Sequence, residues 1–169
     1  MATTHGSITD EQAALIRGAQ MFFVASAAPD MSGGPIGQGP INLSPKGGSP
    51  LHVIGPNRVA YLDYTGSGNE TARHAVAGGP VTVMAMSMGY EDAAIVRLYG
   101  HARVVPLDAS DLKDRLQSEP AEHLELPQRQ VIDIAVEGTQ TSCGYGVPVY
   151  EFVAQRVRAQ RGRKHKARK

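Results

Sequence analysis

The sequence predicts a mainly β fold, a small antiparallel β-barrel with peripheral helices, and three observations lead to that prediction. Short apolar or alternating segments recur at close intervals, and few stretches show helical periodicity. The 19 glycines and 11 prolines indicate many turns. Finally, 169 residues, 41% of them hydrophobic, are enough for one domain with a substantial core.

The first predicted element is a helix over residues 10–20. Thr9 is followed three residues later by Gln12, which is the order of a capping box. An apolar run over residues 21–27 then predicts a buried strand. Residues 28–40 contain four glycines and three prolines, so we expect a long loop there.

The middle of the chain predicts a strand, a hairpin and a helix. Apolar and polar residues alternate over 41–44, as in a strand with one buried face. Residues 51–54 and 58–64 flank a Gly-Pro-Asn turn and predict a hairpin. The segment 69–77 follows a glycine-rich turn and ends at Gly-Gly-Pro, which is typical of a short helix.

The last third of the chain continues the β pattern. An exposed helix is expected over 107–117, with Asp108 or Ser110 as its N-cap. The remaining predicted strands are 81–88, 94–105, 131–136 and 149–153.

The net charge of +1 averages two unlike parts of the chain. Eight of the 17 basic residues lie within 156–169, whereas all 16 acidic residues lie at or before Glu151. We therefore predict one domain over residues 1–155, with a charge of −7, and a basic, disordered tail over 156–169. The tail has no aromatic residue to stack on bases, so specific nucleic-acid binding through it is not expected.

Several protein classes do not fit the composition. No apolar stretch approaches the roughly 20 residues of a membrane-spanning helix, and no signal peptide is evident at the N-terminus. The single cysteine, Cys143, cannot form an intrachain disulfide, so we expect a cytoplasmic protein. The six histidines show no metal-binding spacing, and no Gly-x-Ser-x-Gly motif is present. Cys143 has no histidine nearby in sequence, which favours a structural or ligand-lining role over a nucleophilic one.

Two neighbouring features could bind an anionic ligand. The turn Gly66-Ser-Gly-Asn joins a strand to a helix, where free N–H groups suit a phosphate; a tight turn with a helix cap explains it equally well. Asn42, Ser44 and Lys46 share one face of a strand and could bind a polar ligand, or lie at a solvated strand end. Arg97 stands in an apolar strand and could meet a carboxylate or phosphate, or lie on an exposed face.

Five motifs in this order carry a family resemblance: Phe22-Phe-Val-Ala-Ser, Ile41-Asn-Leu-Ser-Pro-Lys-Gly, Tyr61-Leu-Asp-Tyr-Thr-Gly-Ser-Gly-Asn-Glu-Thr, Arg97-Leu-Tyr-Gly and Ser142-Cys-Gly-Tyr-Gly-Val-Pro. Together they resemble the pyridoxamine 5′-phosphate oxidase-like, FMN-binding split-barrel proteins over residues 8–155. The resemblance implies a six-stranded antiparallel split barrel, and a homodimer with FMN bound at its interface.

The resemblance also implies where the cofactor lies. The FMN phosphate would lie against the turn at Gly66–Glu70, Arg97 close to the flavin or the substrate, and the stretch from Ser142 would close the site. The implied cofactor-binding residues are Asn42, Leu43, Ser44, Lys46, Asp63, Tyr64, Gly66, Ser67, Gly68, Asn69, Glu70, Arg97, Ser142 and Tyr145.

Two departures argue against oxidation of pyridoxamine phosphate itself. The oxidases carry Ser-Arg-Lys where this chain has about Ser67-Gly-Asn-Glu, and the C-terminal tryptophan of the oxidases is missing. We therefore expect an FMN-dependent oxidoreductase acting on another small molecule. The alternatives are a reductase that uses the deazaflavin F420, and a flavin- or haem-binding protein without turnover.

Overall fold

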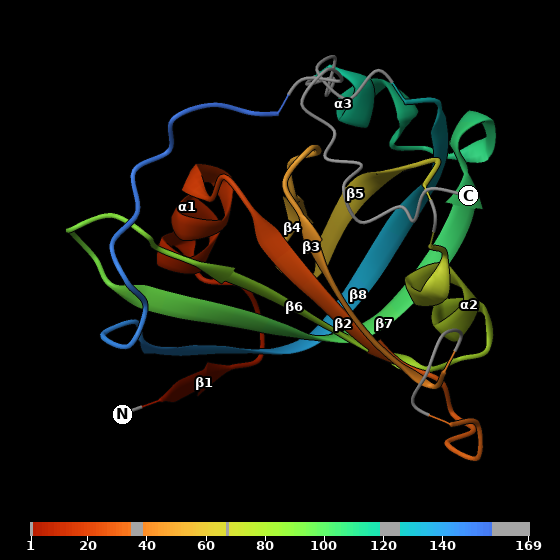
Figure 1. Ribbon diagram of the computed structural model, residues 1–169, viewed down its shortest axis with the longest axis horizontal. Helices are drawn as coiled ribbons and strands as arrows, with labels where there is room; N and C mark the ends of the chain where they lie inside the picture. The colour runs from red at the N-terminus through yellow and green to blue at the C-terminus, as the bar shows by residue number, and fades with distance from the viewer. Residues whose placement is uncertain (1, 35–38, 67, 119–125, 157–169) are drawn as a thin grey trace, which may run out of the picture.

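A computed structural model describes residues 2–34, 39–66, 68–118 and 126–156 (Figure 1). These residues form one antiparallel sheet of eight strands in the order β3-β2-β6-β7-β8-β5-β4, with β1 paired to β8. The strands are β1 (Thr3–His5), β2 (Phe22–Ala27), β3 (Ile41–Lys46), β4 (His52–Gly55), β5 (Arg58–Tyr64), β6 (Pro80–Met86), β7 (Ala94–Pro106) and β8 (Gln128–Cys143). The helices are α1 (Asp10–Gly18), α2 (Glu70–Val76), α3 (Lys113–Gln117) and a 3-10 turn, η1 (Leu107–Ala109).

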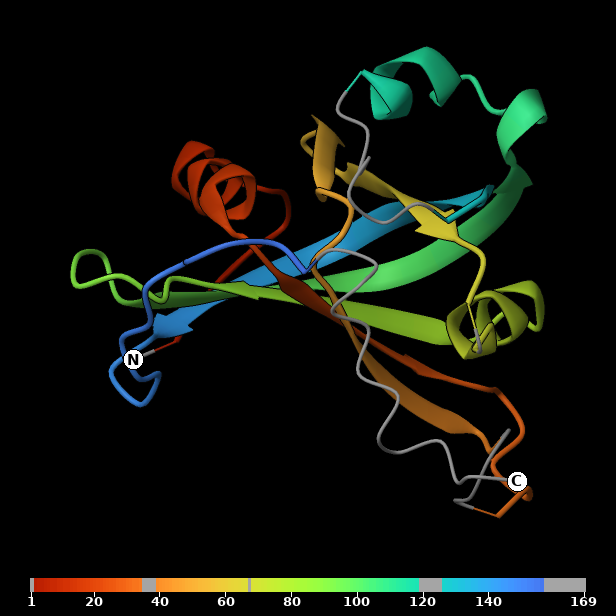
Figure 2. The same cartoon turned by 45° about the horizontal axis from the view of Figure 1, so that its top comes forward.

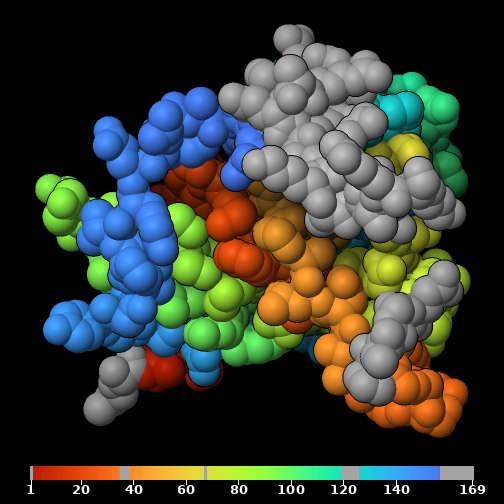
Figure 3. All heavy atoms as spheres, viewed as in Figure 1, coloured from red at the N-terminus to blue at the C-terminus, as the bar shows by residue number. Residues whose placement is uncertain are grey.

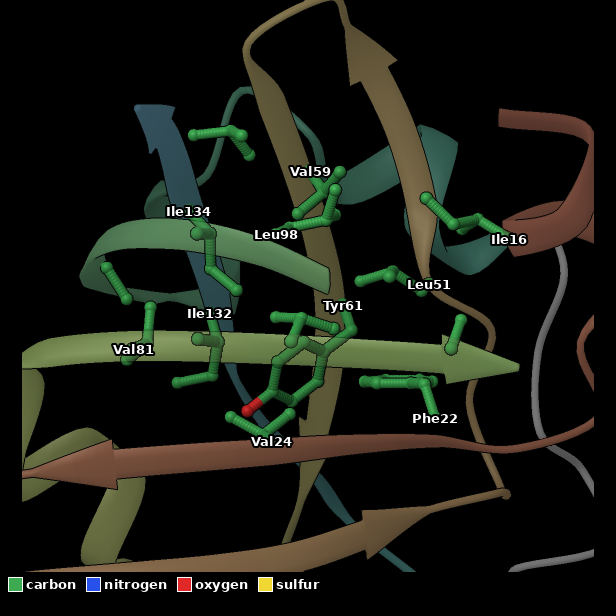
Figure 4. Packing of buried hydrophobic residues seen from close by; sticks show 14 of the residues in the cluster. Ile16, Phe22, Val24, Leu51, Val59, Tyr61, Val81, Leu98, Ile132 and Ile134 are labelled. Carbon is green, nitrogen blue, oxygen red and sulfur yellow. The ribbon is translucent and has the colours of Figure 1, made fainter. Parts of the chain in front are cut away.

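The sheet curls around a core but is not closed by hydrogen bonds. Its path ends at β3 on one side and β4 on the other, and the structure describes no pairing between these two edge strands. Figure 4 shows the core side chains of β2, β5, β6, β7 and β8 meeting inside the curl. The rings of Phe22 and Tyr61 pack edge-to-face there, with centroids 5.4 Å apart. The opening between β3 and β5 is where the candidate site lies.

The helices α1 and α2 cover opposite ends of this core (Figures 1 and 2). The predicted capping box is confirmed: the Gln12 N–H donates to Thr9 Oγ1, and the Thr9 N–H donates to Gln12 Oε1. His74 of α2 is buried, and its ring nitrogens contact Ser26 Oγ at 3.0 Å and the Gly39 carbonyl at 3.2 Å. These contacts hold α2 against β2 and against the end of the loop before β3.

The prediction of one exposed helix over 107–117 is wrong. The segment forms η1 and then α3, and neither has a side-chain N-cap. Ser110 Oγ instead accepts a hydrogen bond from the Leu112 N–H. Leu112 and Leu116 are buried against the outer face of β5 and β8, because this part of the sheet is covered on both faces. Burial of these leucines, rather than helix periodicity, determines the conformation.

Three further expectations differ from the structure. The described residues contain eight strands rather than six; two of them, β1 and β4, are short. Residues 149–153 form no strand, and the Tyr150 N–H donates only to the Met88 carbonyl. The strand expected over 131–136 extends from Gln128 to Cys143, because β7 offers a partner along nearly its whole length. Of the proposed tail, all but Arg156 lies outside the described residues.

None of the helices that the structure describes is long and apolar enough to cross a membrane.

Candidate functional site

A cavity of about 270 Å³ lies at the opening of the sheet, between β3, β5 and the start of α2. Most of its lining residues carry polar or charged side chains, and they come from several different elements. The lining residues are Asn42, Ser44, Lys46, Tyr61, Asp63, Tyr64, Gly66, Gly68, Asn69, Glu70, Thr71, Ala72, Arg129 and Ile132. The structure therefore brings together nine of the fourteen residues that the sequence singled out.

The alternation of β3 directs three of these side chains into the cavity. Asn42, Ser44 and Lys46 are partly buried on the inner side, whereas Leu43 points away and is 66% exposed. Asn42 Nδ2 donates to Thr71 Oγ1 of α2 at 3.2 Å, which ties the edge strand to the helix. In a solvated strand end, all three of these side chains would be exposed, and here they are partly buried. The opposite face of β3 is the exposed one, and it carries the apolar residues Ile41 and Leu43.

Asp63 at the end of β5 is the centre of the charge network. Its Oδ2 accepts from Arg129 Nη2 at 2.5 Å and from Gln130 Nε2 at 2.9 Å. Its Oδ1 lies 3.7 Å from Lys46 Nζ. One buried carboxylate thus orders two cations that come from β3 and β8.

Arg129 and Gln130 were not expected at the site, and a β-bulge explains why both reach it. Tyr64 pairs with Gln128 and Asp63 pairs with Gln130, so Arg129 is the extra residue of β8. A bulge breaks the strict alternation of side chains and directs two consecutive residues toward one partner. The sequence before Val131 carries no signal for this bulge, since only the pairing with β5 creates it.

The turn before α2 does not form the side-chain cap by Asn69 that was the alternative to a phosphate site. Asn69 is the N-cap residue, but its side chain makes no capping bond; its Oδ1 accepts from Gln130 Nε2 at 2.9 Å. Gly66 and Gly68 line the cavity, and Ser67 lies outside the described residues. Glu70 also lines the cavity, so the two cations Lys46 and Arg129 face two carboxylates there.

One hydroxyl that lines the cavity, Ser44 Oγ, is buried and has no hydrogen-bond partner among the described residues. The buried Tyr61 side chain lines the same cavity, and its hydroxyl interacts with the Thr71 side chain. Burial, followed by the negative charge of Asp63, raises the pKa of Tyr61, so the phenol stays neutral. An unpaired buried hydroxyl is costly, and Ser44 Oγ lines a cavity that a polar ligand could enter.

The remaining predicted residues lie outside the cavity. Arg97 is on the outer face of β7, and its Nη1 donates to Ser142 Oγ of β8 at 2.9 Å. Tyr145 follows β8 and is 93% exposed. Cys143 is a free, exposed thiol, and the described residues contain no cluster of side chains suited to a metal ion.

Comparison with known proteins identifies the family. A family model described as pyridoxamine 5′-phosphate oxidase matches residues 8–143. A pyridoxamine 5′-phosphate oxidase family protein of Aspergillus flavus, ustO, is 36% identical over 136 residues, which cover 78% of this chain and 50% of that protein. The chain therefore spans about half the length of this curated relative.

Solved structures show the same fold at low identity. A variant of HupZ from Group A Streptococcus matches with a TM-score of 0.57 and 21% identity, covering 80% of this chain and 99% of that one. An FMN-binding protein from Syntrophomonas wolfei matches with a TM-score of 0.55 and 11% identity, covering 75% and 80%. The open antiparallel sheet is thus the split-barrel fold, and the chain belongs to the pyridoxamine 5′-phosphate oxidase family.

Proposed function

We propose that the protein is an FMN-dependent oxidoreductase that acts on a small molecule other than pyridoxamine phosphate. The observation that carries the proposal is the cavity at the sheet opening, where Ser44 Oγ is buried without a partner beside Lys46 and Arg129. The chain's family, and the FMN-binding protein that shares its fold, support a flavin as the ligand.

The residues of this cavity fit part of FMN. Amide, hydroxyl and cationic donors are what a phosphate and a ribityl chain require. The volume of about 270 Å³ is below the roughly 300–1,000 Å³ of ordinary ligand pockets. The cavity would therefore hold the polar end of the cofactor, while the ring system lies outside it.

The chain's own contribution is binding and orientation. Lys46 and Arg129, ordered by Asp63, would hold an anionic group, and Asn42 and Ser44 would orient a polar chain. When bound, FMN supplies the transfer of a hydride or of electrons. The Tyr61 phenol is neutral, because burial raises its pKa, and a neutral phenol can donate a hydrogen bond to a ligand.

We further propose a homodimer in which each cofactor lies between two copies. The outer face of the sheet carries exposed apolar side chains: Ile41 and Leu43 of the edge strand are each 66% exposed, and Tyr99 of β7 is 38% exposed. Arg97 and Ser142 lie on the same outer face. A second copy would cover this face and could place these two residues beside the exposed part of the flavin.

A flavin titration tests the proposed function. Purified full-length protein, titrated with FMN, F420 and haem and followed by absorbance and fluorescence, should bind FMN most tightly. Arg129→Gln should weaken FMN binding about tenfold or more, because a charge-assisted contact is lost. Arg73→Gln, on the exposed side of α2, is the matched control and should change it less than twofold. No measurable FMN binding by the wild type would refute the proposal, and tighter binding of F420 or haem would favour those alternatives.

Sedimentation analysis tests the proposed dimer. Leu43→Asp should convert a dimer into a monomer, because it places a charge among the exposed apolar side chains of this face. Tyr90→Asp, at a residue that is 92% exposed away from that face, should leave the dimer intact. A wild-type monomer at micromolar concentration would contradict the dimer without affecting the flavin titration.

A further inference from the structure

A second, larger cavity of about 920 Å³ lies away from the candidate site. It is bounded by α1, by the end of the β6–β7 hairpin and by residues 150–155, and it shares no lining residue with the first cavity. Figure 3 shows the C-terminal segment, in blue, beside α1 and the β6–β7 hairpin. Neither the sequence motifs nor the proposed flavin site accounts for this groove.

The walls of the groove are mainly apolar. Met21, Met86 and Met88 contribute three thioethers, which adapt readily to the shape of a ligand. Gln12 lies at its floor and is 2% exposed, but its amide is already paired with Thr141 Oγ1 and Thr139 Oγ1 at 2.9 Å. The floor therefore demands no hydrogen bond from a ligand and favours an apolar body.

Residues 150–155, here called the strap, cross one side of the groove and are attached at both ends. The Tyr150 N–H donates to the Met88 carbonyl at 2.8 Å, and Gln155 Nε2 donates to the Gly47 carbonyl at 2.8 Å. The rings of Tyr150, at the first attachment, and of Phe152, two residues later, line the groove, yet these residues remain 61% and 53% exposed. Two aromatic rings held at the mouth and not buried by the protein are available to an apolar ligand.

The charged residues of the groove all have one sign. Four carboxylates line it, those of Glu11, Glu91, Asp92 and Glu151, whereas no lysine, arginine or histidine is among its described lining residues. Asp92 adopts a left-handed backbone with φ of 52°, which is uncommon for a residue other than glycine and holds its carboxylate in the hairpin turn. A ligand with a positive charge would be attracted to this rim and an anion repelled.

We propose that this groove binds a small molecule with an apolar, preferably aromatic, body and a protonated amine. The apolar walls and the two strap rings would cover the body, and the acidic rim would pair with the amine. A volume of about 920 Å³ lies within the range of ordinary small-molecule pockets. The proposal is independent of the flavin, since the two cavities have no residue in common.

A pair of probes with the same body and opposite charge tests this inference. 4-Phenylbutylamine and 4-phenylbutyrate are titrated into the full-length protein by calorimetry at low salt and neutral pH. The amine should bind about tenfold or more tightly than the carboxylate because of the acidic rim. Equal affinities, or binding of neither probe at millimolar concentration, would overturn the proposal.

Variants locate the binding. Ala14→Trp fills the groove from α1 and should abolish binding of the amine, whereas Ala109→Trp, on the exposed turn η1, should not. The triple variant Glu91→Gln, Asp92→Asn, Glu151→Gln changes only exposed side chains and should reduce the preference for the amine to below about threefold. The triple variant decides the question if Ala14→Trp does not fold. Amine binding that Ala14→Trp leaves unchanged, or a preference for the amine that the triple variant leaves unchanged, would overturn the proposal. Dissociation of a dimer by Ala14→Trp would also overturn it, since the groove would then be a contact between two copies of the chain.

Discussion

Replacement of Gly100 by alanine is expected to destabilise the protein by about 3 kcal/mol or more, enough to prevent folding of a domain of ordinary stability. A Cβ at this position of β7 would lie 1.9 Å from the Ala135 carbonyl oxygen and 3.2 Å from Val136 Cα. Both atoms belong to the backbone of β8, so neither can move without breaking the pairing of the two longest strands. Urea unfolding followed by circular dichroism measures the loss.

Gly138 provides the matched control for this prediction. It lies on the other side of the same irregularity, where the pairing changes between Tyr99 and Gly100. A Cβ there would meet only the His5 carbonyl oxygen, at 3.8 Å, which is ordinary van der Waals contact. Gly138→Ala should therefore cost less than about 1 kcal/mol. Similar losses of stability in both variants would show that the close approach of β7 and β8 at Gly100 does not cause the destabilisation.

Asp133→Asn is expected to lower the free energy of unfolding by about 2 to 3 kcal/mol at neutral pH. Asp133 is 4% exposed, and its two oxygens accept from Arg58 Nε at 2.9 Å and from Arg103 Nη2 at 2.6 Å. The variant removes the buried counter-charge of both guanidinium groups. Arg58 keeps only the exposed Asp111, and the solvent access of Arg103 keeps the loss below that of a fully buried pair. Asp111→Asn removes the exposed partner of Arg58 and should cost at most about 1 kcal/mol.

The same residue should make stability depend on pH. Burial raises the pKa of Asp133, but the hydrogen bonds from Arg58 and Arg103 outweigh it, so the pKa lies below its usual value. A carboxyl whose pKa is lower in the folded state stabilises the protein above its unfolded pKa, about 3.9, and loses this contribution as the pH falls through the folded pKa. The difference between wild type and Asp133→Asn should be constant above about pH 5 and shrink below about pH 4. A difference that stays constant down to pH 2 would contradict this origin.

Local sequence patterns predicted most of the elements because local interactions form them. The capping box of Thr9 and Gln12 begins α1 at Asp10, and the alternation of β3 matches its observed inner and outer faces. Predictions failed where a distant segment decided the outcome. The stretch 107–117 becomes a 3-10 turn and a short α-helix because Leu112 and Leu116 pack on β5 and β8, and β8 runs to Cys143 because β7 pairs with it.

The residues of the candidate site also fall into those that the sequence could place and those that only distant contacts place. Asn42, Ser44 and Lys46 could be assigned to one face because a strand alternates, and Asp63 could be placed beside them through the family motif. Arg129 could not, since it reaches Asp63 only through a bulge between β5 and β8. Conversely, Arg97 lies on the outer face, three strands away from Lys46 in the sheet order, and the orientation of β7 decides this.

The sequence by itself determined the mainly β class, the order of the motifs and the family, because periodicity, turns and motifs each depend on residues that are close together in the sequence. It also showed that the basic residues gather in the last fourteen positions, so that the domain itself is acidic. Only the tertiary structure decided which cations face Asp63, that the Ser44 hydroxyl remains unpaired, and that a second, acid-rimmed groove lies under the strap. These features arise from strand register and from contacts between residues far apart in sequence, and no local pattern encodes either of them.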